Sequence, residues 1–237
     1  LNDVGAAEAA LRKILEFDPT NEIALDALAQ LFSGRGKDKE YIVALEQKLE
    51  AAGSIERRKE ILREIARVFA ERMNNPREAQ GALERALELE PDATTLQSLI
   101  GLQRAAGDFG AVANSLLRMR DIAGTPEERS QIQVEVAAVY EREIQDEESA
   151  VQAYVQALEF DPANVAALTA LEQLYTRLNR PAELLAVYER QIELTDDYRE
   201  KVKIYFKSAQ IWEDTYQNLG NADQCIEYAL MLDSQNL

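Results

Sequence analysis

The sequence contains no histidine, and this absence excludes several kinds of active site. Without imidazole there is no Ser-His-Asp triad, no Cys-His pair and no histidine-ligated zinc centre. Cysteine occurs once, as Cys225, so the chain forms no internal disulfide and no thiolate cluster. No apolar run reaches the roughly 20 residues of a membrane-spanning helix, so no membrane insertion is expected. We therefore predict a protein that is not an enzyme and that uses neither a metal nor another cofactor.

Acidic residues outnumber basic ones, 43 to 26, which gives the 237-residue chain a formal charge of −17. This charge argues against nucleic acid as a partner, because phosphate backbones are held by cations that release counterions. Hydrophobic residues make up 46% of the chain, an ordinary share for a globular protein, so disorder is not expected. No segment shows the period-two alternation of a strand. We therefore predict a soluble all-α protein, and we expect it in the cytoplasm.

Four short segments of the chain resemble one another and mark an internal repeat. They end at Pro19, Pro91, Pro162 and Ser234, which lie 72, 71 and 72 residues apart. A block of this length is too long for one helical hairpin and holds two. The chain opens on Leu1 instead of methionine, inside the second helix of a hairpin, and it stops at Gln235–Leu237 on the entrance to another first helix. We therefore expect a fragment of a longer array.

Apolar side chains at i, i+3 and i+4 spacing predict amphipathic helices throughout. Thr125 and Glu128 have the spacing of a capping box at a helix start, as do Asp197 and Glu200. The first helices of the hairpins are predicted over 22–36, 54–73, 92–107, 126–146, 164–180 and 197–216. The hairpins themselves are predicted over 22–53, 54–91, 92–124, 125–162, 163–196 and 197–233, with 1–19 as a preceding second helix, in one continuous domain 1–237.

Three of these hairpins resemble the tetratricopeptide repeat. In that family the first helix carries a large apolar residue, a small residue and, three positions later, an aromatic one, and the second helix carries small and large apolar residues before a closing proline. The matching residues are Ile65-Ala66, Phe69, Ala79, Leu83, Ala86 and Pro91, then Val136-Ala137, Tyr140, Ala150, Tyr154, Ala157 and Pro162. The third hairpin has Ala209, Trp212, Ala222, Ile226 and Ala229, with Ser208 in place of the large apolar residue. The resemblance implies an α-solenoid, a right-handed superhelix of antiparallel helical hairpins.

The hairpins between these three depart from the family pattern. Tyr41, Val112 and Leu184 stand where the second helix carries a small residue. Hairpin lengths also alternate between about 32 and about 39 residues, whereas the family unit is a uniform 34. The repeating object is therefore a block of two unequal hairpins.

In the resembling family, the first helices line the concave face of the stack. In this chain they hold 16 basic and 18 acidic residues, whereas the remainder holds 10 and 25, so the excess acid is expected elsewhere. Amides can bond to a peptide backbone and cations to carboxylates, so this face suits a protein or peptide partner. The predicted groove residues are Gln30, Arg63, Arg67, Gln97, Arg104, Gln131, Gln173, Arg177, Lys203, Lys207 and Gln210.

Several alternatives stay open. The same residues can be solvated helix faces without a ligand. The chain can also be a structural or self-assembly module that associates through its ends or convex face, or the regulatory region of a larger enzyme. A receptor for chaperone tails is not expected, because Arg63, Arg67 and Gln97 replace the lysine and asparagine set that some cochaperones of this family carry. Cys225 and Trp212 are expected to pack in the core.

Overall fold

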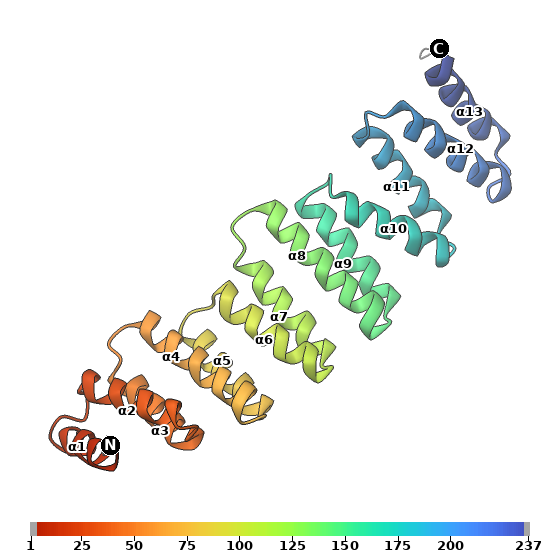
Figure 1. Cartoon of the computed structure of the whole chain (residues 1–237). Coiled ribbons are helices and arrows are strands. Elements are labelled where there is room, and N and C mark those ends of the chain that lie inside the picture. The colour runs from red at the N-terminus through yellow and green to blue at the C-terminus, as the bar shows by residue number, and fades with distance from the viewer. Residues whose placement is uncertain (1–3, 235–237) are drawn as a thin grey trace. The chain divides into compact units, whose positions relative to one another are not determined.

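The structure is a computed structural model that describes residues 4–234, and in this range it contains helices and no strand. The chain divides into two compact units, Leu1–Ile122 and Ala123–Leu237, which we call unit 1 and unit 2 and describe separately. In each unit the helices form antiparallel hairpins stacked as in an α-solenoid (Figure 1). The predicted all-α class is confirmed, whereas the single continuous domain and the right-handed superhelix stay predictions. The expected start of another helix at 235–237 lies outside the described residues.

Unit 1 contains α1 (Val4–Phe17) and three hairpins. In each hairpin the two helices contact each other, and the second helix contacts the first helix of the next hairpin. The hairpins are α2 (Glu22–Gly34) with α3 (Asp38–Ala51), α4 (Ile55–Arg67) and its π-helical turn η1 (Val68–Arg72) with α5 (Pro76–Leu89), and α6 (Ala93–Ala106) with α7 (Phe109–Asp121).

Unit 2 repeats this arrangement with three further hairpins. They are α8 (Pro126–Val139) and its π-helical turn η2 (Tyr140–Ile144) with α9 (Glu147–Phe160), α10 (Val165–Arg177) with α11 (Pro181–Leu194), and α12 (Tyr198–Asp214) with α13 (Leu219–Ser234). All six first helices begin and end within three residues of their predicted limits. Local periodicity and helix-breaking residues were therefore sufficient to locate them.

The two predicted capping boxes have different outcomes. The Thr125 hydroxyl accepts the Glu128 N–H at 3.1 Å, and the Glu128 carboxylate accepts the Thr125 N–H at 3.4 Å, so the first box is confirmed. The second prediction is wrong. Asp197 caps α12 through the Arg199 N–H, but Glu200 bonds to Lys203 instead of the cap backbone. The Glu200 carboxylate is thus bound to a neighbouring cation and does not accept the N–H that would complete the capping box.

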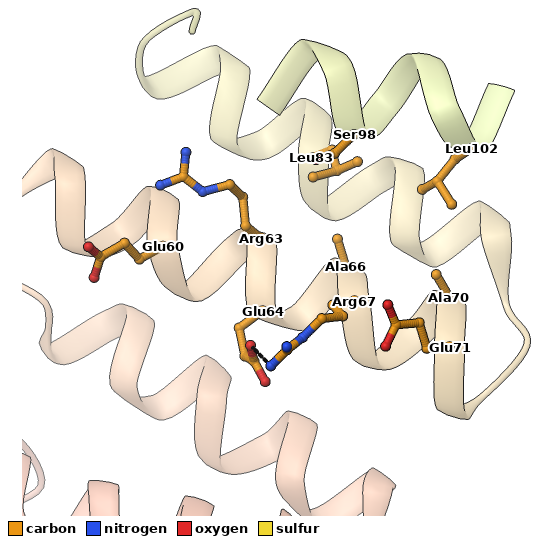
Figure 2. Close-up of a pocket in the computed structure, with 10 residues that line it drawn as sticks. All are labelled: Glu60, Arg63, Glu64, Ala66, Arg67, Ala70, Glu71, Leu83, Ser98 and Leu102. Atoms are coloured by element: carbon orange, nitrogen blue, oxygen red, sulfur yellow. Dashed lines mark hydrogen bonds and ion pairs between the residues drawn. The ribbon is translucent and has the colours of Figure 1, made fainter. Parts of the chain in front are cut away.

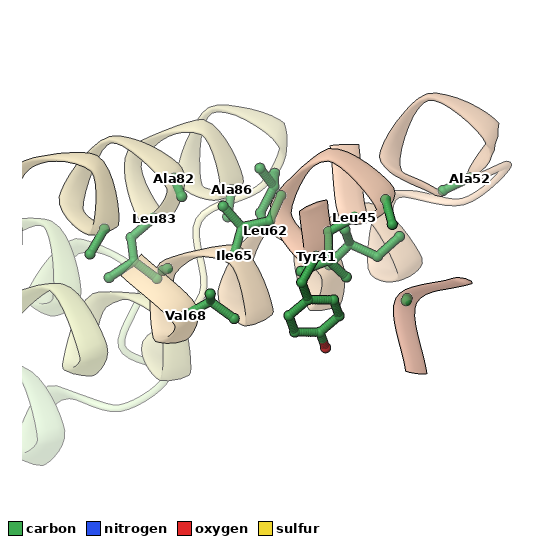
Figure 3. Packing of buried hydrophobic residues seen from close by; sticks show 14 of the residues in the cluster. Tyr41, Leu45, Ala52, Leu62, Ile65, Val68, Ala82, Leu83 and Ala86 are labelled. Carbon is green, nitrogen blue, oxygen red and sulfur yellow. The ribbon is translucent and has the colours of Figure 1, made fainter. Parts of the chain in front are cut away.

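The core of unit 1 lies between its helices and combines small with large apolar residues. Ile65, Ala79 and Ala86 have no exposed surface. Leu83 is buried in the same cluster as Ile65 and Ala86 (Figure 3). Alanine allows two helices to approach closely, and the branched side chains fill the remaining space. These are the positions at which the sequence resembles the tetratricopeptide repeat, so that pattern encodes packing.

The hairpins reverse direction through residues with positive φ. The short hairpins of unit 1 turn at Gly36 and Gly107, which have φ of 66° and 72°, and the short hairpin α10–α11 of unit 2 turns at Asn179, with φ of 52°. The long hairpins turn at Asn74, Gln145 and Gln217, with φ of 49°, 61° and 50°. Only glycine adopts this left-handed region without a steric cost from its side chain. The long hairpins therefore carry local backbone strain that glycine removes.

We predict that Gln145→Gly raises the free energy of unfolding by about 0.5–1 kcal/mol, because it relieves this strain while the Asp146 N–H still bonds to the Tyr140 carbonyl. Urea unfolding followed by circular dichroism measures the change. The matched control is Gln152→Gly, an exposed position inside α9, where glycine is expected to lower stability by a similar amount. Equal effects of the two substitutions would contradict the prediction.

Candidate binding grooves on the first helices

All eleven predicted groove residues lie on the first helices of hairpins, and ten of them are exposed. Arg63 is the half-buried exception. Arg63 and Arg67 line a groove in unit 1, and Lys207 lines one in unit 2. The other predicted residues line neither groove, so their role in binding stays a prediction.

The groove of unit 1 lies between α4 and α6 and is also lined by Leu83 of α5. We call it the α4–α6 groove. It encloses about 470 Å³. Its apolar lining consists of Ala66, Ala70, Leu83 and Leu102, with Ser98 on the α6 side (Figure 2). Ala66 and Leu83 are buried in the core, and Ala70 and Leu102 are partly exposed. The alanines of the first helix leave the space that larger side chains would fill. The groove can therefore accept an apolar side chain, and charged groups surround it.

Arg67 at the edge of this groove is held by a carboxylate of the same helix. Its guanidinium lies 2.5 Å from the Glu64 carboxylate, which also accepts the Tyr41 hydroxyl at 2.9 Å. Burial alone would raise the pKa of Glu64, but the hydrogen bonds from Arg67 and Tyr41 outweigh it and lower this pKa. A ligand carboxylate must therefore compete with Glu64 for Arg67.

Arg63 has a structural role that the sequence did not reveal. Its guanidinium lies 3.4 Å from the Asp92 carboxylate and 3.4 Å from the Thr95 hydroxyl. Asp92 is the N-cap of α6, because its carboxylate accepts the Thr95 N–H. Arg63 thus links α4 to the start of the next hairpin, and reversing its charge would disturb packing as well as any ligand.

The groove of unit 2 lies between α10 and α12, beside α11, and we call it the α10–α12 groove. It encloses about 370 Å³ and is lined by Val165, Leu168, Leu194 and Ile204. Val165 and Leu194 expose 70% and 38% of their surface. At the edge, Lys207 bonds to Glu172 at 2.8 Å, so its charge is also neutralised within the chain. The available surface is therefore mainly apolar.

The equivalent place in unit 1, between α2 and α4, is closed. Asp26 pairs there with Lys48 at 2.5 Å and lies 4.0 Å from Arg57, and only about 20 Å³ remains. The repeat places Thr169, Gln191 and Glu200 at the same three positions in unit 2. These three residues cannot form that ion pair, so the α10–α12 groove stays open.

The remaining predicted cations differ in their availability. Arg177 is bound to Glu141 at 3.2 Å and Glu147 at 2.5 Å, and Lys203 is bound to Glu200 at 2.6 Å. Arg104 has no ion pair within residues 4–234. The sequence did not identify apolar groove residues such as Leu102 and Val165. Their spacing is the same as that of residues that form the core.

Neither a metal centre nor a membrane span occurs in the part of the chain that the structure describes. Between residues 4 and 234, no cluster of three or more Cys, Asp or Glu side chains has the arrangement to hold a metal ion. None of the helices in this range combines the length and the apolarity that crossing a bilayer requires.

Within residues 4–234 the chain is a helical repeat protein, and part of it matches a known repeat family. The sequence pattern of the tetratricopeptide repeat family matches residues 167–202, which span most of α10, all of α11 and the start of α12. This match includes one of the intervening hairpins, although the long hairpins show the clearer residue pattern. No curated protein matches the chain in sequence.

Several solved structures are similar to the chain. A tetratricopeptide repeat protein from Parabacteroides merdae is 16% identical with a TM-score of 0.41, covering 97% of this chain and 87% of its own. PilF of Pseudomonas aeruginosa is 18% identical with a TM-score of 0.40, covering 89% and 91%. A double mutant of MamA is 15% identical with a TM-score of 0.40, covering 75% and 96%. Similarity at this level supports no statement about what the chain binds.

Proposed function

We propose that the chain is a protein-binding scaffold that holds a peptide or a partner helix on its first helices, with an apolar side chain of the partner seated in the α4–α6 groove. The observation that carries this proposal is the groove itself. Arg63 and Arg67, two of the predicted residues, line this groove, which has a volume of about 470 Å³ and a partly apolar lining. Sites that bind ligands are concave, largely apolar and equipped with a few polar groups that orient the ligand.

The ion pairs around the groove define how such a partner binds. Arg67 is bound to Glu64, so exchanging one carboxylate for another yields little net energy. Affinity must then come mainly from burying apolar surface on Ala70 and Leu102, while the charges orient the partner. This division favours a segment with an apolar anchor over a purely acidic one.

The test uses peptides selected from a random displayed library with the whole chain as bait. Binding of a selected peptide is then measured by fluorescence anisotropy. Ser98→Trp fills the groove and is expected to weaken binding by at least about tenfold, whereas Arg67→Glu weakens it by roughly threefold. Asn114→Trp, an exposed substitution on α7 outside the groove, is the matched control and leaves binding within about twofold.

Two outcomes would overturn the proposal: no peptide is selected, or the selected peptides bind equally well to Ser98→Trp. Light scattering over a range of concentrations, run on the same samples, tests the alternative of self-association. Arg63 is not used as a test position, because its bond to Asp92 would mix a folding effect with a binding effect.

A further inference from the structure

A third cavity lies on the other side of α12, away from the α10–α12 groove. That helix directs Ile204 and Lys207 to the groove, and Tyr205, Ser208 and Trp212 to the cavity. The cavity lies between α11, α12 and α13, encloses about 430 Å³, and is called here the α11–α13 cavity. Its other lining residues are Leu185, Glu189, Ile192, Glu193, Asn221, Gln224, Cys225 and Tyr228.

In unit 1 the equivalent space is filled by the core. Ser208 corresponds in the repeat to Ile65, which has no exposed surface. Cys225 corresponds to Ala82, which is buried, whereas Cys225 is only half-buried. The expectation that Cys225 is buried is therefore wrong, and Trp212 is likewise half-buried. The small Ser208 leaves a gap here, and its hydroxyl bonds back to the Ile204 carbonyl at 3.0 Å.

At the equivalent place in unit 1, an arginine side chain pairs with a glutamate. Arg85 of α5 extends to α3, where its guanidinium bonds to both carboxylate oxygens of Glu46 at 2.7 and 3.0 Å. The repeat places Glu189 at the position of Glu46, and Tyr228 at the position of Arg85. Unit 2 thus keeps the carboxylate and lacks the arginine. Glu189 is exposed and has no hydrogen bond or ion pair within the described range 4–234.

Aromatic rings form the walls where the arginine is missing. The rings of Tyr205 and Tyr228 lie 5.6 Å apart, and Trp212 stands on the same side of α12 as Tyr205. The faces of aromatic rings attract cations, and arginine stacks on them most often. Unit 2 as a whole carries 22 acidic and 9 basic residues, against 21 and 17 in unit 1. Its field therefore favours the approach of a cationic segment.

We infer that the α11–α13 cavity is a second binding site, which takes an arginine side chain of a protein partner. The guanidinium bonds to Glu189 as Arg85 does to Glu46, and it lies against the rings of Tyr205 and Tyr228. The aliphatic part of the arginine covers Leu185 and Ile192. Because this cavity and the α4–α6 groove share no residue, either site can fail its test without affecting the other.

The single tryptophan of the chain reports on this cavity, because Trp212 lines it. The probe is N-acetyl-arginine methylamide, titrated into the whole chain while tryptophan fluorescence is recorded. N-acetyl-citrulline methylamide, which has the same shape without the charge, is titrated at matched ionic strength. We expect a saturable change in the millimolar range with the arginine compound, and at least about tenfold weaker binding of the citrulline compound.

Two substitutions sharpen the test. Glu189→Gln is expected to weaken the arginine compound by about tenfold, whereas Glu227→Gln, the same change at an exposed α13 position outside the cavity, leaves it within about twofold. Tyr228→Arg restores the arginine of unit 1 and is expected to abolish the response by occupying the site. No saturable response, equal responses to the two compounds, or equal effects of Glu189→Gln and Glu227→Gln would each overturn the inference.

Discussion

Replacing Asp92 by alanine is expected to lower the free energy of unfolding by about 3 kcal/mol, because this carboxylate joins two hairpins. It caps α6 by accepting the Thr95 N–H at 2.9 Å, and it pairs with Lys59 of α4 at 3.1 Å. The Lys59 side chain is only 4% exposed, so its ammonium has lost most of its hydration. The ion pair with the Asp92 carboxylate compensates for this loss. Urea unfolding followed by circular dichroism measures the loss.

Asp92→Asn separates the two roles of this residue. Asparagine keeps the cap, as Asn164 does at the equivalent position in unit 2 by accepting the Ala167 N–H at 3.0 Å, so only the charge is lost. The expected cost at neutral pH is about 1 kcal/mol. A cost equal to that of the alanine variant would show that the charge, and not the cap, carries the whole effect.

The pH dependence follows from the same site. Burial raises the pKa of Asp92, but the hydrogen bonds from Thr95 and Lys59 outweigh it, so the folded pKa is lowered. On acidification the unfolded chain takes up this proton first, which favours unfolding. The difference in the free energy of unfolding between the wild-type chain and Asp92→Asn should therefore be constant above about pH 5. It should decrease as the pH falls below about 4. A gap that persists at lower pH would contradict the lowered pKa.

Ile65→Ala is expected to cost about 3 kcal/mol, because Ile65 is fully buried between α4 and its neighbours and its removal leaves a cavity. The matched control is Ile55→Ala, ten residues earlier on the same helix, where half of the side chain is exposed (Figure 3 shows the packing around Ile65). The control is expected to cost less than about 1 kcal/mol. Denaturant unfolding of both variants provides the comparison, and similar costs would show that the space around Ile65 collapses after the truncation.

The helices and their hairpins were largely predictable from the sequence. The i, i+3, i+4 pattern, the prolines and the capping residues act within one or two turns, so Pro76 and Thr125 locate helix starts without any knowledge of distant neighbours. The left-handed turn at Gln145 was missed, because glutamine gives no local signal for positive φ. The turn is closed there by the Asp146 N–H, which bonds to the Tyr140 carbonyl at 2.9 Å.

The candidate site was predictable only in part. The resemblance placed eleven residues on the first helices, but the sequence did not show that Arg67 and Lys207 are held by Glu64 and Glu172. The Lys207–Glu172 pair joins side chains 35 positions apart, so no local pattern encodes it. The availability of these two cations therefore depends on tertiary structure.

By itself, the sequence determined an acidic, all-α repeat without histidine chemistry, because composition and helical periodicity are local properties. Only the tertiary structure decided which spaces between the helices are open. Similar backbone positions enclose about 20 Å³ where Asp26 pairs with Lys48 and about 370 Å³ where Thr169 and Gln191 replace them. A groove is open or closed according to the contacts between side chains of different helices. These contacts form only in the packed structure.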